Sequence, residues 1–173
     1  MPGLLRFVQK VQGDAPQALL AAGIAPRLAQ LLAARGIDTR EAAQRYLHPQ
    51  KTDLYDPMRM QDMDKAVACI REAIAGGEPI VIYGDYDVDG VMATCILLTF
   101  LKKQGANVSY YIPDRHGEGY GLNIPAVESI AQRARLLITV DCGITSGVEV
   151  ARARELGMRV IVTDHHQPGG PPL

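Results

Sequence analysis

Residues 80–90 read IVIYGDYDVDG, and the interpretation of the whole chain starts from this stretch. A short run of Val and Ile that stops at turn residues is typical of a buried strand in a parallel sheet. Here the run leads directly into Asp85, Asp87 and Asp89. Gly90 then allows a tight turn into the following segment. The stretch therefore predicts a strand, a turn that carries three carboxylates, and a helix.

Two further apolar segments end in the same way. Residues 136–140 read LLITV and precede Asp141. Residues 160–163 read VIVT and precede a triplet of polar side chains: Asp164, His165 and His166. Ligands of open α/β sheets bind outside the carboxyl ends of the strands, so all these groups should face one place. So much negative charge repels itself, and a divalent cation such as Mn²⁺, Mg²⁺, Fe or Zn would neutralise it.

Strands and helices alternate beyond Glu78, which is the pattern of βαβ units and of a parallel sheet. The apolar runs predict strands over residues 80–84, 107–112, 136–140 and 158–163. The intervening helices are expected at about 90–104, 125–133 and 146–156. The sequence thus predicts the α/β class, with a doubly wound, mainly parallel sheet in the order 2-1-3-4 and a site at its switch point.

The N-terminal part of the chain has a different pattern. Apolar residues from Leu28 onward recur at helical spacing, and Thr39 is placed to cap a short helix that runs through Leu47. We therefore predict a helical N-terminal appendage with a linker over residues 1–60. Residues 61–173 would form the α/β domain.

The composition excludes several classes of protein. The 173 residues are 47% hydrophobic, and 18 Lys and Arg nearly balance 19 Asp and Glu, for a net charge of −1. This balance neither indicates nor excludes a nucleic-acid partner, because a local basic groove suffices. The three cysteines lack the spacing of a disulfide framework or a zinc knuckle, and Cys95 is expected in the core. Without a signal peptide or a long apolar run, we expect a cytoplasmic protein and no membrane partner.

The acidic motif has other interpretations. Asp85 and Asp87, two apart in extended backbone, face the same side and can share a metal. A calcium EF loop also begins D-x-D-x-D-G, but its twelfth position needs a bidentate Glu and is Ile96 here. Helix capping explains one carboxylate, for which Asp89 suffices. Haloacid-dehalogenase-type phosphatases also begin D-x-D, but they need a later Lys and acidic pair that the last triplet does not supply.

The other two motifs are weaker when each stands alone. Asp141-Cys142-Gly143 is also an ordinary strand-to-helix turn. In the triplet, one His can bind a metal while the other contacts a phosphate or moves a proton. Neighbouring residues on a strand point to opposite faces, so both need not bind one ion.

Four segments together resemble a known family. GDYDVDG, TVDCGI and VTDHH, in this order, look like the first three motifs of the DHH phosphoesterase superfamily. EGYGLN, residues 118–123, with IPDR ahead of it, is similar to the RecJ-type single-strand-specific DNA exonucleases. The resemblance extends from about Ala25 to the end of the chain.

This resemblance implies a reaction and a set of site residues. The reaction is 5′→3′ hydrolysis of single-stranded DNA in repair and recombination, by a site with two Mn²⁺ or Mg²⁺ ions. The implied metal ligands are Asp85, Asp87, Asp141 and His165. His166 would contact the scissile phosphate or complete the site. The implied residues that orient ligands are Asp89 and Asp164. A single-strand-binding protein and a helicase are the implied protein partners.

The loop before the EGYGLN segment offers weaker candidates for DNA contact. Arg115 could meet a phosphate, although a solvated loop charge is the simpler interpretation. Tyr120 could stack on a base. Tyr110 and Tyr111 could do the same but are expected to pack on opposite faces of a strand.

The resemblance departs from the family at the end of the chain. The family carries a further metal-binding Asp and a second domain, whereas this chain stops seven residues after His166. We therefore expect a truncated α/β domain and little nuclease activity from this chain alone. Two rivals remain open: another DHH enzyme that acts on small phosphodiesters or pyrophosphate, and an inactive remnant that only binds DNA or a partner.

Overall fold

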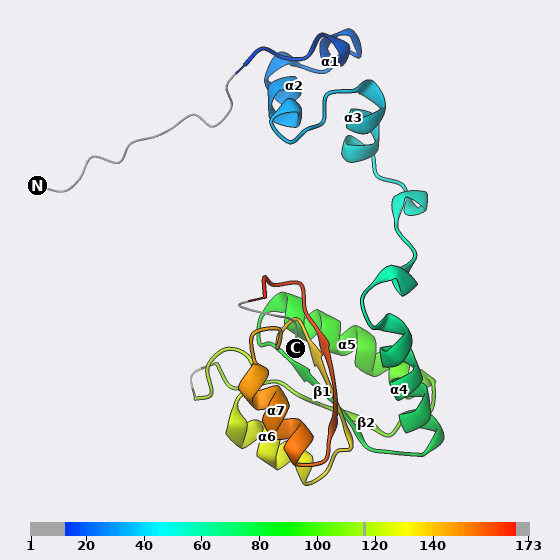
Figure 1. Cartoon of the computed structure of the whole chain (residues 1–173), viewed down its shortest axis with the longest axis vertical. Coiled ribbons are helices and arrows are strands. Elements are labelled where there is room, and N and C mark those ends of the chain that lie inside the picture. The colour runs from blue at the N-terminus through cyan, green and yellow to red at the C-terminus, as the bar shows by residue number, and fades with distance from the viewer. Residues whose placement is uncertain (1–12, 116, 169–173) are drawn as a thin grey trace, which may run out of the picture. The chain divides into compact units, whose positions relative to one another are not determined.

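The computed structural model describes residues 13–115 and 117–168, and Figure 1 shows it as a ribbon. The chain divides into two compact units, Met1–Arg59 and Met60–Leu173. Part of the predicted appendage, residues 1–12, lies outside the described residues. The candidate site belongs entirely to the second unit.

The first unit is a small cluster of helices. It contains α1 (Gln17–Ala21), α2 (Pro26–Ala33) and α3 (Arg40–Leu47), followed by two short 3₁₀ turns at Lys51–Asp53 and Pro57–Arg59. The helices bury a small apolar core made of Leu19, Ala29, Leu32 and Ala43. The Thr39 hydroxyl accepts a hydrogen bond from the Ala42 backbone N–H at 3.2 Å, which confirms the predicted cap. The pattern did not predict α1, which is a helix of five residues.

The second unit is built on a four-stranded parallel sheet. Its strands are β1 (Ile80–Gly84), β2 (Val108–Tyr111), β3 (Leu136–Val140) and β4 (Arg159–Thr163), in the order β2-β1-β3-β4. Every neighbouring pair is parallel. The predicted fold class and strand order are therefore confirmed.

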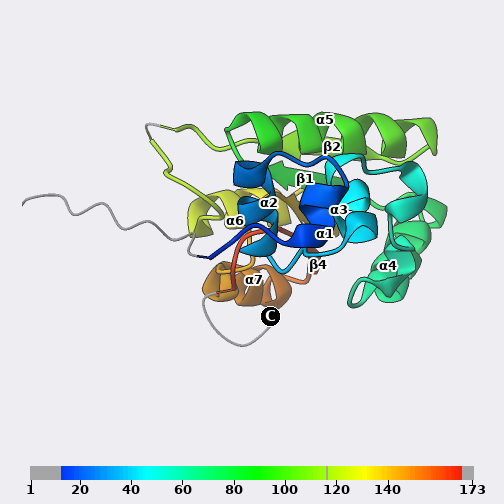
Figure 2. The same ribbon diagram turned by 90° about the horizontal axis from the view of Figure 1, so that it is seen from above.

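Helices cover both faces of this sheet. They are α4 (Met63–Ala75), α5 (Val88–Lys103), α6 (Ile124–Ala131) and α7 (Gly147–Glu155). Figure 2 shows α5 and α7 on opposite sides of the strands. One core cluster joins α6 and α7 to one face, and the other joins α4 and α5 to the opposite face. The central strands β1 and β3 are buried along their whole length, which explains why their sequences are continuously apolar.

Strand β2 lies at an edge of the sheet, and its side chains alternate. Tyr110 is 55% exposed, whereas Tyr111 packs against the core cluster of α6 and α7. The expectation that these tyrosines lie on opposite faces is confirmed.

Helix α5 exposes several side chains to solvent, including one that was expected in the core. Cys95 is exposed, so its assignment to the core is wrong. Val88, Met92, Ile96 and Phe100 recur every four residues and are 53–73% exposed. Because the helix is apolar on all sides, its sequence gives no signal of which side packs on the sheet.

Within the described residues, no helix combines the length and hydropathy needed to cross a membrane.

Candidate metal centre

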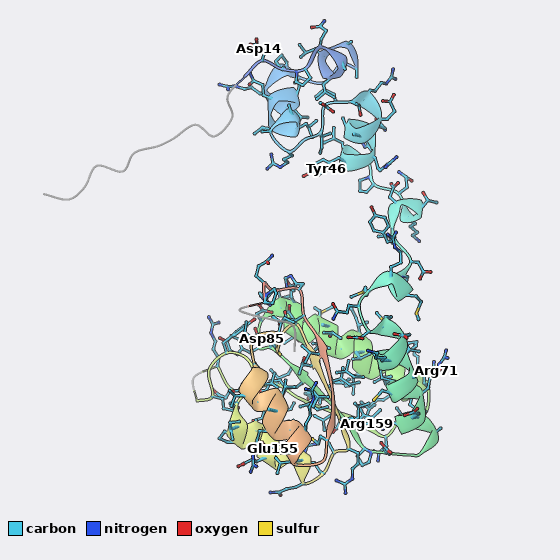
Figure 3. The ribbon with its side chains drawn as sticks, in the orientation of Figure 1. Asp14, Tyr46, Arg71, Asp85, Glu155 and Arg159 are labelled. Atoms are coloured by element: carbon cyan, nitrogen blue, oxygen red, sulfur yellow. The ribbon has the colours of Figure 1, made fainter. Side chains whose placement is uncertain are left out.

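The register of the sheet brings the three acidic motifs to one edge. Gly84 pairs with Val140, and Val140 pairs with Thr163. Each is the last residue of its strand, so the next residues in the chain are Asp85, Asp141 and Asp164. Neighbouring strands lie about 4.8 Å apart, so the three aspartates begin as a row across the strand ends. Figure 3 labels Asp85 at this edge of the unit.

Asp85 is a buried carboxylate without a compensating partner. Its residue is 1% exposed, and neither carboxylate oxygen receives a well-formed hydrogen bond from the described residues. Burial raises the pKa of this carboxyl, the carboxylates of Asp87 and Asp141 raise it further, and the backbone N–H of Tyr86 partly offsets the shift. Buried charges without partners are costly and are normally paired or bound to a metal. The orphaned oxygens of Asp85 therefore fit a cation.

Asp141 and the two histidines form a cluster of possible metal ligands. The Asp141 Oδ1 atom lies 2.9 Å from His165 Nε2. One potential ligand atom from each of Asp141, His165 and His166 lies within 4.8 Å of the others. Carboxylate oxygen and imidazole nitrogen together suit Mn²⁺, Fe or Zn better than Ca²⁺.

The backbone at Asp141 has an unusual conformation. Its φ of 62° lies in the left-handed region, which residues other than Gly, Asn and Asp seldom adopt. The turn is held because the Asp141 N–H donates to Thr163 O at 3.0 Å and the Thr139 hydroxyl donates to Cys142 O at 2.8 Å. This turn directs the Asp141 side chain toward His165.

Asp164 holds His166 in place. Its Oδ1 accepts from the His166 backbone N–H at 3.0 Å and lies 2.7 Å from His166 Nδ1, and its Oδ2 accepts from the Ile144 N–H at 3.0 Å. Burial alone would raise the pKa of Asp164, but these hydrogen bonds outweigh burial and lower it. The bond to Asp164 raises the pKa of His166. With Nδ1 bonded to a carboxylate, Nε2 is the ring atom left for a ligand or a phosphate.

Replacing Asp164 by Asn should lower the pKa of His166, because the imidazolium loses its carboxylate partner. The raised pKa of His166 contributes stability that is complete below about pH 6, near the ordinary value for His, and disappears as pH rises through the raised value. Asp164→Asn should therefore destabilise the protein more at pH 5.5 than at pH 8.5. A nuclear magnetic resonance titration of the imidazole protons and thermal unfolding at both pH values would measure the two effects. A His166 pKa that is unchanged in the variant would contradict this account, and Asp64→Asn is the matched control on an exposed carboxylate.

The other two aspartates of the first motif, Asp87 and Asp89, differ from Asp85 in their environment. Asp87 is the N-cap of α5, and its Oδ1 accepts from the backbone N–H groups of Asp89 at 2.9 Å and Gly90 at 3.0 Å. The alternative in which Asp89 caps this helix is therefore wrong. The Asp89 side chain is exposed, and among the described residues no hydrogen bond or ion pair joins it to the other site residues.

The loop candidates lie beside this cluster. The centroid of the Tyr120 ring lies 6.1 Å from that of the His166 ring and 6.3 Å from that of the Tyr86 ring, and both pairs are edge-on. The Arg115 guanidinium carbon lies 5.3 Å from the centre of the Tyr86 ring. Tyr86 did not emerge from sequence reasoning, although its place between Asp85 and Asp87 is a usable signal.

The arrangement of strands, acidic turns and paired histidines is shared with a known protein family, which a comparison of the sequence with family models identifies. Residues 79–172 match the family model described as "DHH family, N-terminal domain". The match covers more than half of the 173 residues, and the chain belongs to the DHH family.

The relatives include RecJ exonucleases, which confirms the resemblance drawn from the motifs. The chain is 50% identical over 147 residues to the single-stranded-DNA-specific exonuclease RecJ of Bacillus subtilis, an alignment that covers 84% of this chain and 19% of the relative. It is 41% identical over 138 residues to that of Thermus thermophilus, covering 76% of this chain and 21% of the relative. The chain thus spans about a fifth of the length of these curated relatives.

Solved structures give the same result for the fold. A crystal structure of exonuclease RecJ bound to manganese matches with a TM-score of 0.65 and 40% identity, over 69% of this chain and 31% of that chain. The crystal structure of RecJ in complex with Mn²⁺ from Thermus thermophilus matches with a TM-score of 0.65 and 33% identity, over 90% of this chain and 21% of that chain.

Proposed function

We propose that this chain contributes the metal-binding part of an exonuclease that hydrolyses single-stranded DNA in the 5′→3′ direction, using Mn²⁺ or Mg²⁺. The observation that carries the proposal is the buried, unpaired Asp85 carboxylate at the same sheet edge as the Asp141, His165 and His166 cluster. The names of the relatives support DNA as the substrate, and the manganese in the matched structures supports the cofactor.

The metal ligands in this proposal are Asp85, Asp87, Asp141 and His165, and two ions would be held in the complete site. When bound, such a pair of divalent ions activates water and stabilises charge on the phosphoryl oxygens. Asp87 can serve as a ligand while it caps α5, because its capping bonds use only its Oδ1.

His166 is proposed to contact the scissile phosphate. Its hydrogen bond to Asp164 raises its pKa, which increases the fraction of cationic imidazole near neutral pH. A cationic N–H donor forms a stronger hydrogen bond to a phosphate oxygen than a neutral one does. Asp164 orients the ring through Nδ1, while Asp89 remains a proposed orienting residue through its backbone bond to Asp87.

Contacts to DNA outside the reacting phosphate are assigned to Arg115 and Tyr120. Arg115 can pair with a backbone phosphate, and Tyr120 can stack on a base. The proposal also places the protein in DNA repair and recombination and in the cytoplasm. Its proposed protein partners are a single-strand-binding protein and a helicase.

The experiment uses single-stranded DNA labelled at either end, with Mn²⁺, and compares this chain with a form extended to the length of its relatives. We expect the extended form to release nucleotides from the 5′ end and the short chain to release little, because two-ion hydrolysis needs both ions fixed about 3.5–4 Å apart. Asp87→Ala should abolish release by the extended form, while Asp64→Ala, at an exposed position in α4, should not.

Other outcomes separate the rival functions. Hydrolysis of dinucleotides or pyrophosphate without hydrolysis of DNA would favour another DHH enzyme. Mn²⁺ binding and DNA binding without hydrolysis by either form would favour a protein that only binds. Release from the 3′ end would contradict the proposed direction.

A further inference from the structure

Two tyrosines at the ends of neighbouring strands hold the loop that follows β2. Tyr83 on β1 and Tyr111 on β2 are register partners, and their rings stack with centroids 5.2 Å apart. Tyr83 is fully buried. The Tyr83 hydroxyl donates to Gly121 O at 2.9 Å, and the Tyr111 hydroxyl donates to Glu118 Oε1. Both hydroxyls therefore bind the segment that leads to α6.

Glu118 is the central acceptor of this network. Its Oε1 binds the Tyr111 hydroxyl, and its Oε2 accepts from the Asp114 backbone N–H at 2.7 Å. The Asn123 amide donates to the Tyr83 hydroxyl at 3.3 Å and to Glu118 at 3.4 Å, while its oxygen caps α6 by accepting from Ala126 N–H at 2.8 Å. These bonds lower the pKa of Glu118 and raise that of Tyr111 to about 12, so the donor and acceptor keep their roles near neutral pH.

Tyr120 lies between two anchored points of this loop. Glu118 is fixed on one side and Gly121 on the other. Gly119 and Gly121 have φ values of 80° and 77°, in the region that glycine adopts without strain. The backbone on both sides of Tyr120 is therefore determined, yet its own residue is 56% exposed. The network therefore fixes the backbone on both sides of an exposed aromatic ring.

The ring that is presented in this way lies beside the candidate site. The Tyr120 hydroxyl is 3.5 Å from both ring nitrogens of His166, and the Tyr86 ring flanks it on another side. Stacking of a base on an aromatic side chain is tolerant of base identity, which suits a nuclease without sequence preference.

We propose that Tyr83, Tyr111 and Glu118 are positioning residues that hold Tyr120 as a stacking platform for the base of the nucleotide whose phosphate meets His166. The proposal rests on the proposed function of the site, in which Tyr120 stacks on a base, and deepens it by assigning the residues that hold Tyr120 and the nucleotide whose base it meets. Tyr86 forms the second wall of this base subsite.

The test uses a short oligothymidylate with the fluorescent base 2-aminopurine at its 5′ end, titrated into the chain with Mn²⁺. Stacking on Tyr120 should quench the fluorescence. Tyr120→Ala should remove the quenching and weaken binding by roughly 5- to 100-fold. Tyr111→Phe, which removes only the anchoring hydroxyl, should weaken binding by about 2- to 10-fold. Tyr110→Phe, on the opposite face of the same strand, is the matched control and should behave as wild type.

A double-mutant cycle separates positioning from general stability. If Tyr111 acts through Tyr120, Tyr111→Phe should have no further effect on binding in the Tyr120→Ala background. Loss of the nuclear Overhauser contacts between the Tyr120 and His166 rings in Tyr111→Phe would show the displacement directly. Calorimetric titration with Mn²⁺ should give the same affinity in all these variants.

The outcomes distinguish this proposal from the function on which it rests. Mn²⁺-dependent binding that is insensitive to Tyr120→Ala, or additive effects of the two substitutions, would overturn the base subsite and leave the proposed function intact. Absence of oligonucleotide binding by the wild-type chain would also overturn the base subsite, while the end-labelled DNA assay on the extended form tests the proposed function separately.

Discussion

Asp85→Asn is expected to stabilise the metal-free protein and to weaken its binding of Mn²⁺. The wild-type carboxylate is buried, unpaired and close to two other carboxylates. A neutral amide removes the charge from this environment, where an unsatisfied group costs about 1–3 kcal/mol and a charged one more. The same change removes a candidate ligand, and affinity should fall by more than about 100-fold, since even groups that only orient ligands contribute roughly 10- to 100-fold.

The stabilisation should depend on pH in a defined direction. The pKa of Asp85 is raised in the folded protein, so the wild type has no penalty below the ordinary pKa of Asp, about 4. As pH rises through the raised value, the folded state must hold a buried charge and loses stability. The stability difference between Asp85→Asn and wild type should therefore be small near pH 3.5 and largest near pH 7.

Thermal unfolding in chelator at several pH values, and calorimetric titration with Mn²⁺, would measure both effects. Saturating Mn²⁺ should reverse the order of stability, because the wild type gains more binding free energy than the variant does. Asp64→Asn changes an exposed carboxylate and should shift stability by no more than about 0.5 kcal/mol. A less stable Asp85→Asn protein at pH 7 without metal would show that the carboxylate has a compensating partner.

Gly90→Ala is expected to be destabilising although Gly90 lies in the first turn of a helix. A Cβ atom at this position would lie 2.6 Å from the carbonyl oxygen of Asp85 and 2.7 Å from its nitrogen. These are backbone atoms, so α5 and the end of β1 must move apart. Overpacking of this kind typically costs about 1–3 kcal/mol, and the upper part of this range applies because backbone atoms cannot give way as a flexible side chain can. The gain of about 1 kcal/mol that Ala usually brings to a helix interior offsets only part of this cost.

The displacement should reach the metal centre as well, because the atoms that must move belong to Asp85. We expect urea unfolding at a lower midpoint and weaker Mn²⁺ binding in the same variant. Gly117→Ala is the matched control, since its Cβ would meet only the Asp114 Oδ1 atom at 3.9 Å. Wild-type stability for Gly90→Ala would mean that the strand and helix are less closely packed than the structure shows.

The sheet could be predicted because its strands carry continuous apolar runs. β1 and β3 are buried on both faces, so every residue from Ile80 to Gly84 and from Leu136 to Val140 is apolar or Gly except Tyr83 and Thr139, whose hydroxyls are hydrogen-bonded. The boundaries of α5 and β2 differ from the expected ones by one or two residues. The exposed side of α5 could not be predicted, because periodicity identifies a buried side only when the other side is polar.

The candidate site was predictable in its location but not in its contacts. Strand-end carboxylates must gather at one edge of a parallel sheet, and they do. The choice of Asp87 over Asp89 as the helix cap depends on where α5 begins, which local pattern does not determine. The short distance between Asp141 and His165 depends on a left-handed backbone conformation that no spacing rule indicates. Convergence of Asp85, Asp87, Asp141 and His165 on one polar cleft stays a prediction.

The alignment of strand ends also decides where this protein can change in length. Deleting one residue from β3 would shift its pairing with β1 and β4 by one position and send Asp141 toward the opposite face. Insertions in the connections between helices and strands add only a slowly growing entropy of loop closure. Natural insertions and deletions should therefore collect in those connections, while residues 80–85, 136–141 and 159–164 keep a constant count.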